Sequence, residues 1–187
     1  MRSDPRRDRP LSRSIIKLLA SIFLGRARAH YHSWLPFLTV EGRGPCSPGR
    51  GVYCGKTVVD LRAADDLASV CANAIYIVGS GPSVAAQDLS GLPPRSVMLL
   101  NGAIVLSSGQ IETPLAVVIE DERFVWRHFE MMRDKILQHH VCLFSLGVLR
   151  AICEIDEAWL AGRSIILIDD IRKPYGRKRQ RGAELAT

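Results

Sequence analysis

A glycine-rich segment directly after a run of β-branched residues is the part of this sequence best suited to bind a ligand. The run Ile-Tyr-Ile-Val leads straight into Gly79, Ser80, Gly81, Pro82 and Ser83. Glycine at 79 and 81 allows a tight turn and the close approach of a ligand, because neither residue carries a Cβ atom. Ser83 is placed to cap a short helix, whose free N–H groups would face a phosphate. The turn therefore predicts a phosphate site; the alternative is a strand-to-helix turn without a ligand.

This turn differs from the dinucleotide-binding fingerprint Gly-x-Gly-x-x-Gly. Val84 occupies the third glycine position, and Pro82 removes an N–H donor. Asn101, followed by Gly102, stands where such sites carry an acid that binds the ribose. An amide both donates and accepts hydrogen bonds, which suits a neutral sugar or the edge of a base. Asp121 follows the third apolar run and completes the set of candidate binding residues.

Five short apolar runs alternate with helical patterns and would position these residues. Apolar residues recur at helical spacing within 125–136 and within 148–159. Such alternation indicates parallel strands, because these need crossover connections. We therefore predict an α/β fold with a mostly parallel, Rossmann-like sheet and helices on both faces. The predicted strands are Ile75 to Val78, Val97 to Leu100, Leu115 to Ile119, Val141 to Phe144 and Ile165 to Ile168.

Ligands of such sheets bind beyond the carboxyl ends of the strands, where the strand order reverses. The segments 79–83, 101–102 and 120–121 follow the first three predicted strands. In a doubly wound topology, these three segments would face one crevice.

The sequence divides into four segments by composition. Residues 1–40 form a basic leader with an amphipathic helix, and residues 41–56 are a Gly/Pro-rich linker. Residues 57–171 are expected to form a Rossmann-like domain that contains the candidate ligand-binding turn, and residues 172–187 a disordered basic tail.

The leader contains an apolar run that is about half as long as a membrane-spanning helix requires. A helix in the membrane interface fits it, because basic residues flank an apolar stripe. A helix docked on the core and a secretory signal peptide are the alternatives. The stripe consists of Ile15, Leu18, Leu19, Ile22 and Phe23, with Arg13, Lys17 and Arg26 beside it.

Charge and cysteine content argue against a nucleic-acid-binding domain and against a disulfide or zinc framework. The formal net charge of +6 divides into +6 for residues 1–30, −5 for the middle and +5 for residues 172–187. A nucleic-acid-binding domain would carry its positive charge on a folded face, so we expect no nucleic-acid partner. The five cysteines are odd in number and lack C-x-x-C spacing. This pattern favours a reducing, cytoplasmic compartment without a disulfide framework or zinc site.

Three separated stretches resemble one family. "IYIVGSGPSVAAQDLSGLP", "VMLLNGAI" and "PLAVVIEDERFV" occur in this order within residues 57–130. Together they resemble bacterial sialyltransferase-like proteins and, within that group, the transferases of 3-deoxy-manno-octulosonic acid (Kdo) in the lipopolysaccharide core. Members of the family show a strand with a G-x-G-P-S turn, a strand that ends in Asn, and a strand that ends near an Asp.

The resemblance implies a glycosyltransferase that moves a Kdo-like acidic sugar from a CMP-activated donor to the lipopolysaccharide core. It makes residues 57–171 a nucleotide-sugar-binding domain. Residues 79–83 would surround the donor phosphate and sugar, Asn101 with Gly102 would contact the nucleotide, and Asp121 matches the acid after the third strand. It implies no cofactor and no metal beyond the donor substrate. The expected location is cytoplasmic and peripheral, on the inner face of the inner membrane with its anionic surface.

The family's catalytic residues lie beyond the fifth strand, whereas this chain ends at Thr187. We therefore expect a truncated form, assign no catalytic residue, and expect enzyme activity only if the chain is functionally complete. An inactive nucleotide-binding module is one alternative. A pterin pyrophosphokinase-like enzyme, with Mg²⁺ held by Glu120 and Asp121, is another. The histidines His128, His139 and His140 are expected to be structural or solvated.

Overall fold

The centre of the fold is a sheet of five parallel strands. The computed structural model describes residues 10–23, 37–44, 47–70 and 74–168. The strands follow one another in the order β4-β5-β6-β7-β8, and all five predicted strands are confirmed to within one residue at each end. Their bounds are β4 Tyr76–Val78, β5 Val97–Leu100, β6 Ala116–Ile119, β7 Val141–Phe144 and β8 Ser164–Leu167.

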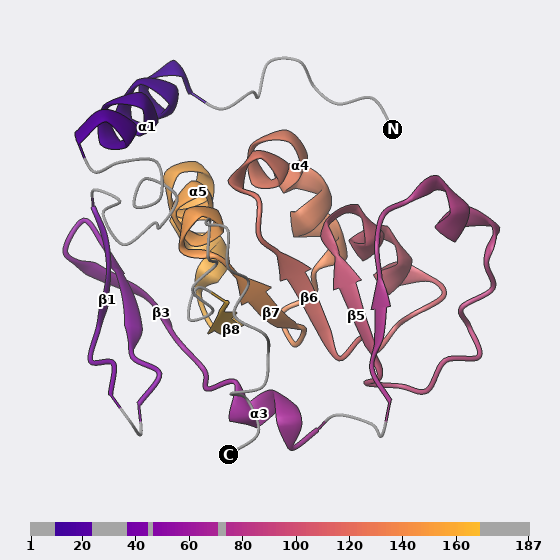
Figure 1. Ribbon diagram of the computed structural model, residues 1–187. Coiled ribbons are helices and arrows are strands. Elements are labelled where there is room, and N and C mark those ends of the chain that lie inside the picture. The colour runs from indigo at the N-terminus through magenta and orange to yellow at the C-terminus, as the bar shows by residue number, and fades with distance from the viewer. Residues whose placement is uncertain (1–9, 24–36, 45–46, 71–73, 169–187) are drawn as a thin grey trace, which may run out of the picture.

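One layer of helices covers this sheet. The 3₁₀-helix η3 (Asn101–Ser108) follows β5, α4 (Glu122–Lys135) follows β6, and α5 (Leu146–Asp156) with η4 (Glu157–Leu160) follows β7. Because α4 contacts both η3 and α5, the three lie side by side (Figure 1). The helix predicted within 125–136 is confirmed as α4, and the helix predicted within 148–159 is confirmed as α5 with η4.

The two faces of the sheet differ in burial. Leu99, Ile119 and Phe144 are fully buried toward the helices. On the opposite face Ile77 is 69% exposed and Met98 is half-buried. Right-handed crossovers between strands in sequential order place every helix on the same face, which explains this difference. We predicted helices on both faces. They are confirmed on one face of the described sheet, and a helix layer on the other face stays a prediction.

A small antiparallel sheet precedes the parallel one and corrects the predicted linker over 41–56. Its strands β1 (Leu38–Glu41), β2 (Arg50–Tyr53) and β3 (Lys56–Asp60) pair in sequence order. Gly49 and Gly55 adopt φ of +84° and +80°, so the glycines that suggested a linker form turns between strands.

This small sheet belongs to the same core as the parallel sheet. A Cβ atom at Gly51 would lie 3.4 Å from the side chain of Leu149 on α5, and Val59 is part of the buried cluster. Leu61 forms a parallel bridge with Ile165 of β8. The structure therefore places no domain boundary at residue 57, because β3 crosses that position.

The remaining helices are short or peripheral. The predicted amphipathic helix is present as α1 (Leu11–Phe23), while α3 (Asp65–Ala68) and η2 (Pro82–Ala86) have four and five residues. None of the helices in the described ranges has both the length and the apolarity needed to cross a bilayer. The predicted tail at 172–187 and most of the predicted leader lie outside the described residues.

Candidate functional site at the carboxyl edge of the sheet

Three of the predicted segments lie at one edge of the sheet. The segments 79–83, 101–102 and 120–121 directly follow β4, β5 and β6, which are parallel neighbours. Neighbouring strands lie about 4.8 Å apart, so the first and third segments start about 10 Å from each other. The described strand order contains no reversal. The segments therefore share an edge because their strands are neighbours. A reversal of strand order, as in a doubly wound sheet, is not involved.

The glycine turn is in direct contact with the end of β5. A Cβ atom built on Gly102 would lie 3.0 Å from the Cβ atom of Ser80 and 3.5 Å from its hydroxyl oxygen. A separation of 3.0 Å is closer than side chains normally pack, so glycine at 102 lets Ser80 approach the β5 end. This contact brings the turn beside Asn101, the residue that precedes Gly102 in the chain.

Asn101 combines a strained backbone with an unsatisfied polar atom. Its φ is +48°, a left-handed conformation that few residues other than glycine adopt, although asparagine tolerates it better than most. Its Oδ1 atom is buried and has no hydrogen-bond partner among the described residues. A buried acceptor without a donor costs about 1 to 3 kcal/mol. Asn101 therefore carries an acceptor that no described residue uses.

The two glycines of the turn are not required by the fold. Gly81 has φ −65° and ψ 152°, and Gly79 is likewise outside the left-handed region. An added Cβ atom would meet nothing within 4 Å at 79 and only the Ser83 hydroxyl, at 3.8 Å, at 81. Neither glycine therefore uses the conformational freedom that the prediction of a tight turn invoked. The second predicted role of these glycines is to let a ligand approach closely. The exposed turn leaves room for such an approach to the backbone.

Ser83 does not cap a helix, contrary to the prediction. The 3₁₀-helix η2 begins at Pro82 with Gly81 as its N-cap, and no side chain caps it. Proline favours the first helical position because its φ is preset and its missing N–H would be free there. The helix thus starts before Ser83, whose exposed hydroxyl remains available. Donors for a phosphate would come from the turn itself rather than from a helix terminus.

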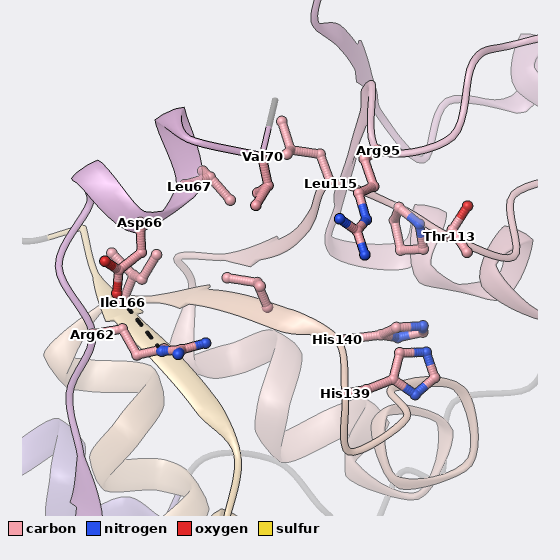
Figure 2. Close-up of a pocket in the computed structure, with 12 residues that line it drawn as sticks. Arg62, Asp66, Leu67, Val70, Arg95, Thr113, Leu115, His139, His140 and Ile166 are labelled. Carbon is pink, nitrogen blue, oxygen red and sulfur yellow. Dashed lines mark ion pairs between the residues drawn. The ribbon is translucent and has the colours of Figure 1, made fainter. Parts of the chain in front are cut away.

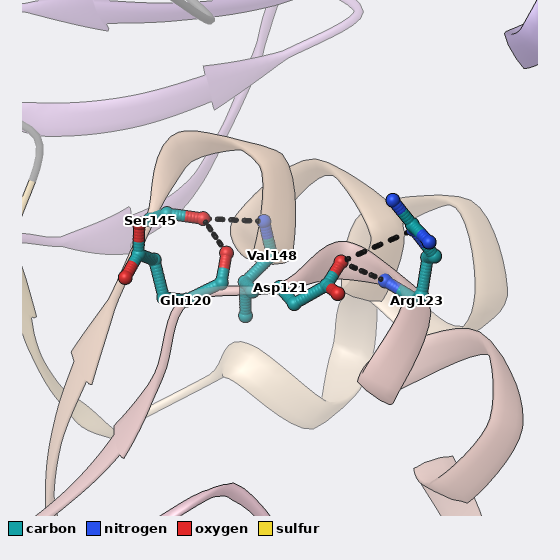
Figure 3. Close-up of polar contacts among 5 residues, drawn as sticks. All are labelled: Glu120, Asp121, Arg123, Ser145 and Val148. Carbon is teal, nitrogen blue, oxygen red and sulfur yellow. Dashed lines mark hydrogen bonds and ion pairs between the residues drawn. The ribbon is translucent and has the colours of Figure 1, made fainter. Parts of the chain in front are cut away.

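Asp121 caps α4 at the end of β6 (Figure 3). Its carboxylate accepts a hydrogen bond of 2.9 Å from the backbone N–H of Arg123 and lies 3.8 Å from the Arg123 Nε atom. Beside it, the hydroxyl of Ser145 donates to the Glu120 carbonyl at 2.8 Å and accepts from the Val148 N–H at 3.2 Å. These bonds hold the residues that follow β6 and β7 in place. A contact of Asp121 with a donor sugar stays a prediction. The described residues contain no group of three His, Cys, Asp or Glu side chains that could hold a metal ion.

The histidines lie away from this edge. His128 is half-buried within α4, 5.0 Å from the ring of Phe124, and burial followed by the Arg127 charge lowers its pKa. His139 and His140 precede β7, so they lie at the opposite edge of the sheet. The catalytic base therefore stays unassigned, as the sequence left it.

Comparison with known proteins gave no match: no family model, curated protein sequence or solved structure matches this chain. The resemblance to Kdo transferases stays a prediction.

Proposed function

We propose that this protein binds a CMP-activated, Kdo-like acidic sugar at the carboxyl edge of β4 and β5 and transfers the sugar to the lipopolysaccharide core. The observation that carries the proposal is the contact between Ser80 and Gly102. It brings the exposed glycine turn beside Asn101, whose Oδ1 atom is buried and unpaired among the described residues. In this proposal the parallel sheet is Rossmann-like and uses the edge at which such sheets bind nucleotides.

Each part of CMP has a suitable partner at this edge. The 4-amino group of cytosine is a hydrogen-bond donor and would satisfy the Oδ1 atom of Asn101. The phosphate would lie on the turn, where Ser80 and Ser83 carry hydroxyl donors and Gly79 and Gly81 leave the backbone open. In the transfer, the bond between the anomeric carbon and the phosphate oxygen breaks and CMP leaves. An acceptor hydroxyl forms the new bond and gives up its proton to a base.

The first test is CMP binding by turn variants. In isothermal titration calorimetry, Gly81→Val is expected to weaken CMP binding at least tenfold, because its side chain would occupy the space of the phosphate. Asn101→Ala is expected to weaken it similarly, because it removes the amide acceptor.

Gly91→Val is the matched control for this test. Gly91 is also exposed, and a Cβ atom there would meet nothing within 4 Å. It lies in the loop beyond η2 and should leave CMP affinity unchanged. Equal affinity in the Gly81, Asn101 and Gly91 variants would refute the proposed site. Transfer from CMP-Kdo by the wild type distinguishes an enzyme from an inactive nucleotide-binding module.

The proposed acceptor is held in a membrane, and α1 supplies a surface for it. Six apolar side chains of this helix are exposed, while Ala20 is buried. A helix docked on the core would bury its apolar stripe, so the exposure supports binding at a membrane interface. The exposed residues are Leu11, Ile15, Leu18, Leu19, Ile22 and Phe23.

Binding of the full chain to vesicles tests this part of the proposal. Sedimentation with vesicles that contain phosphatidylglycerol is expected to fall at least tenfold in the Leu18→Asp, Ile22→Asp double variant, because acidic groups would enter the apolar stripe. Leu137→Asp is the matched control, since Leu137 is similarly exposed but lies beyond α4. Unchanged sedimentation of the double variant would contradict the proposal.

A further inference from the structure

A cavity lies at the opposite, amino edge of the parallel sheet. We call it the amino-edge pocket. Its volume is about 210 Å³, which is room for about seven water molecules. Its walls come from α3, from the loop before β5, and from the segments that enter β6 and β7. Because each strand has three or four residues, this pocket lies roughly 10 to 13 Å from the carboxyl edge. Its ligand would not contact the atoms bound there.

One part of the pocket wall is apolar. Leu67 and Val70 line it from the α3 side, while Leu115 and Ile166 line it from the sheet. Val70 is 40% exposed, so this wall is open to solvent at its rim. The wall can therefore cover a small hydrocarbon group.

The charged part of the wall has one arginine in excess. Arg62 lies 3.7 Å from the Asp66 carboxylate and donates to the Ser164 hydroxyl at 3.2 Å. Arg95 has no side-chain hydrogen bond or ion pair within the described ranges, and only its backbone N–H is bound, to the Thr113 carbonyl at 2.9 Å. Figure 2 shows Arg95 on the side of the pocket with the histidines and Arg62 with Asp66 on the other. The unmatched charge is thus that of Arg95.

His140 adds a hydrogen-bond donor to the pocket rather than an acceptor. His140 is only 3% exposed, and its Nδ1 atom accepts from the Leu137 N–H at 3.2 Å, so the ring proton is on Nε2. Burial, followed by the neighbouring His139, lowers the pKa of His140, although the Glu112 backbone carbonyl opposes this shift. A pocket with arginine and N–H donors, whose carboxylate is already paired, is complementary to an anion.

We propose that the amino-edge pocket binds a small amphiphilic anion, with a carboxylate or phosphate group at Arg95 and an apolar body against Leu67, Val70 and Leu115. The volume is below the 300 to 1,000 Å³ of pockets for drug-sized ligands, so the body is short. Since the site is remote from the carboxyl edge, its ligand is distinct from the proposed sugar donor.

The proposal is tested with hexyl phosphate, hexanoate, hexanol and inorganic phosphate as probes on the full chain. In ¹H–¹⁵N NMR titrations, both amphiphilic anions are expected to shift the amide signals of Arg95, Thr113 and His140, with little change at Ser80 and Gly102. Hexanol and inorganic phosphate should bind at least tenfold more weakly, since each lacks one of the two recognised parts. A preference between the two anions identifies the head group.

Two variants separate the pocket from a general charge effect. Arg95→Gln is expected to weaken hexyl phosphate binding at least tenfold, and it should fold because Arg95 is exposed. Arg133→Gln on α4 removes an exposed arginine outside the pocket and should leave binding unchanged. Equal effects of the two variants, or hexanol binding as tightly as hexyl phosphate, would overturn the proposal. These readouts do not depend on CMP binding.

Discussion

Replacing Glu154 with alanine is expected to lower the free energy of unfolding by about 3 to 5 kcal/mol. Arg150 on α5 is only 5% exposed, and its Nε atom donates to the Glu154 carboxylate at 2.7 Å. The Nη1 atom of Arg150 already lacks a partner among the described residues. Removal of the carboxylate would therefore leave a buried positive charge without compensation.

Urea denaturation followed by circular dichroism measures this loss. Glu130→Ala is the matched control, because Glu130 forms an i,i+3 ion pair with Arg133 that is about half exposed. Exposed pairs of this kind contribute about 0.2 to 1 kcal/mol. The double variant Arg150→Met, Glu154→Leu removes both charges and should recover most of the stability. Equal losses in Glu154→Ala and Glu130→Ala would contradict the predicted cost of leaving the Arg150 charge without its partner.

The second large effect is expected at Leu99, in the middle of the sheet. Leu99→Ala should cost about 3 to 5 kcal/mol, because Leu99 is fully buried and its truncation leaves a cavity under the helices. Ile77→Ala on the adjacent strand should cost less than about 1 kcal/mol, since Ile77 is 69% exposed on the other face.

Comparison of these two variants in the same denaturation experiment measures whether the sheet is covered on one face or on both. A loss at Ile77 as large as that at Leu99 would contradict single-face coverage. It would also support the second layer of helices that the sequence predicts.

The elements of this fold were predictable because their signals are local. Continuous apolar runs marked all five parallel strands, and helical spacing marked α4 and α5. The antiparallel sheet was missed because Gly49 and Gly55 indicate a loop equally well when they form turns between short strands. Coverage of one face depends on strand order, which is set by tertiary packing and leaves no periodic signal in the sequence.

The sequence was sufficient to predict which edge of the sheet carries the candidate site. Residues that follow neighbouring parallel strands must meet, so the approach of Ser80 to Gly102 follows from the strand assignment. The left-handed φ of Asn101 and the start of η2 at Pro82 depend on backbone geometry that the residue types only permit. Arg95 belongs to no sequence motif, because it meets the other walls of its pocket only after folding.

The unbroken order of the strands has a consequence for how a nascent chain could acquire this structure. Each strand from β5 to β8 pairs with the strand synthesised immediately before it. The sheet can therefore grow at one edge as the polypeptide leaves the ribosome, without waiting for a distant partner. The bridge from Leu61 to Ile165, with the Arg62 N–H bound to the Ile165 carbonyl at 2.8 Å, joins an early segment to the last strand. That closure would complete the domain only after β8 has been translated.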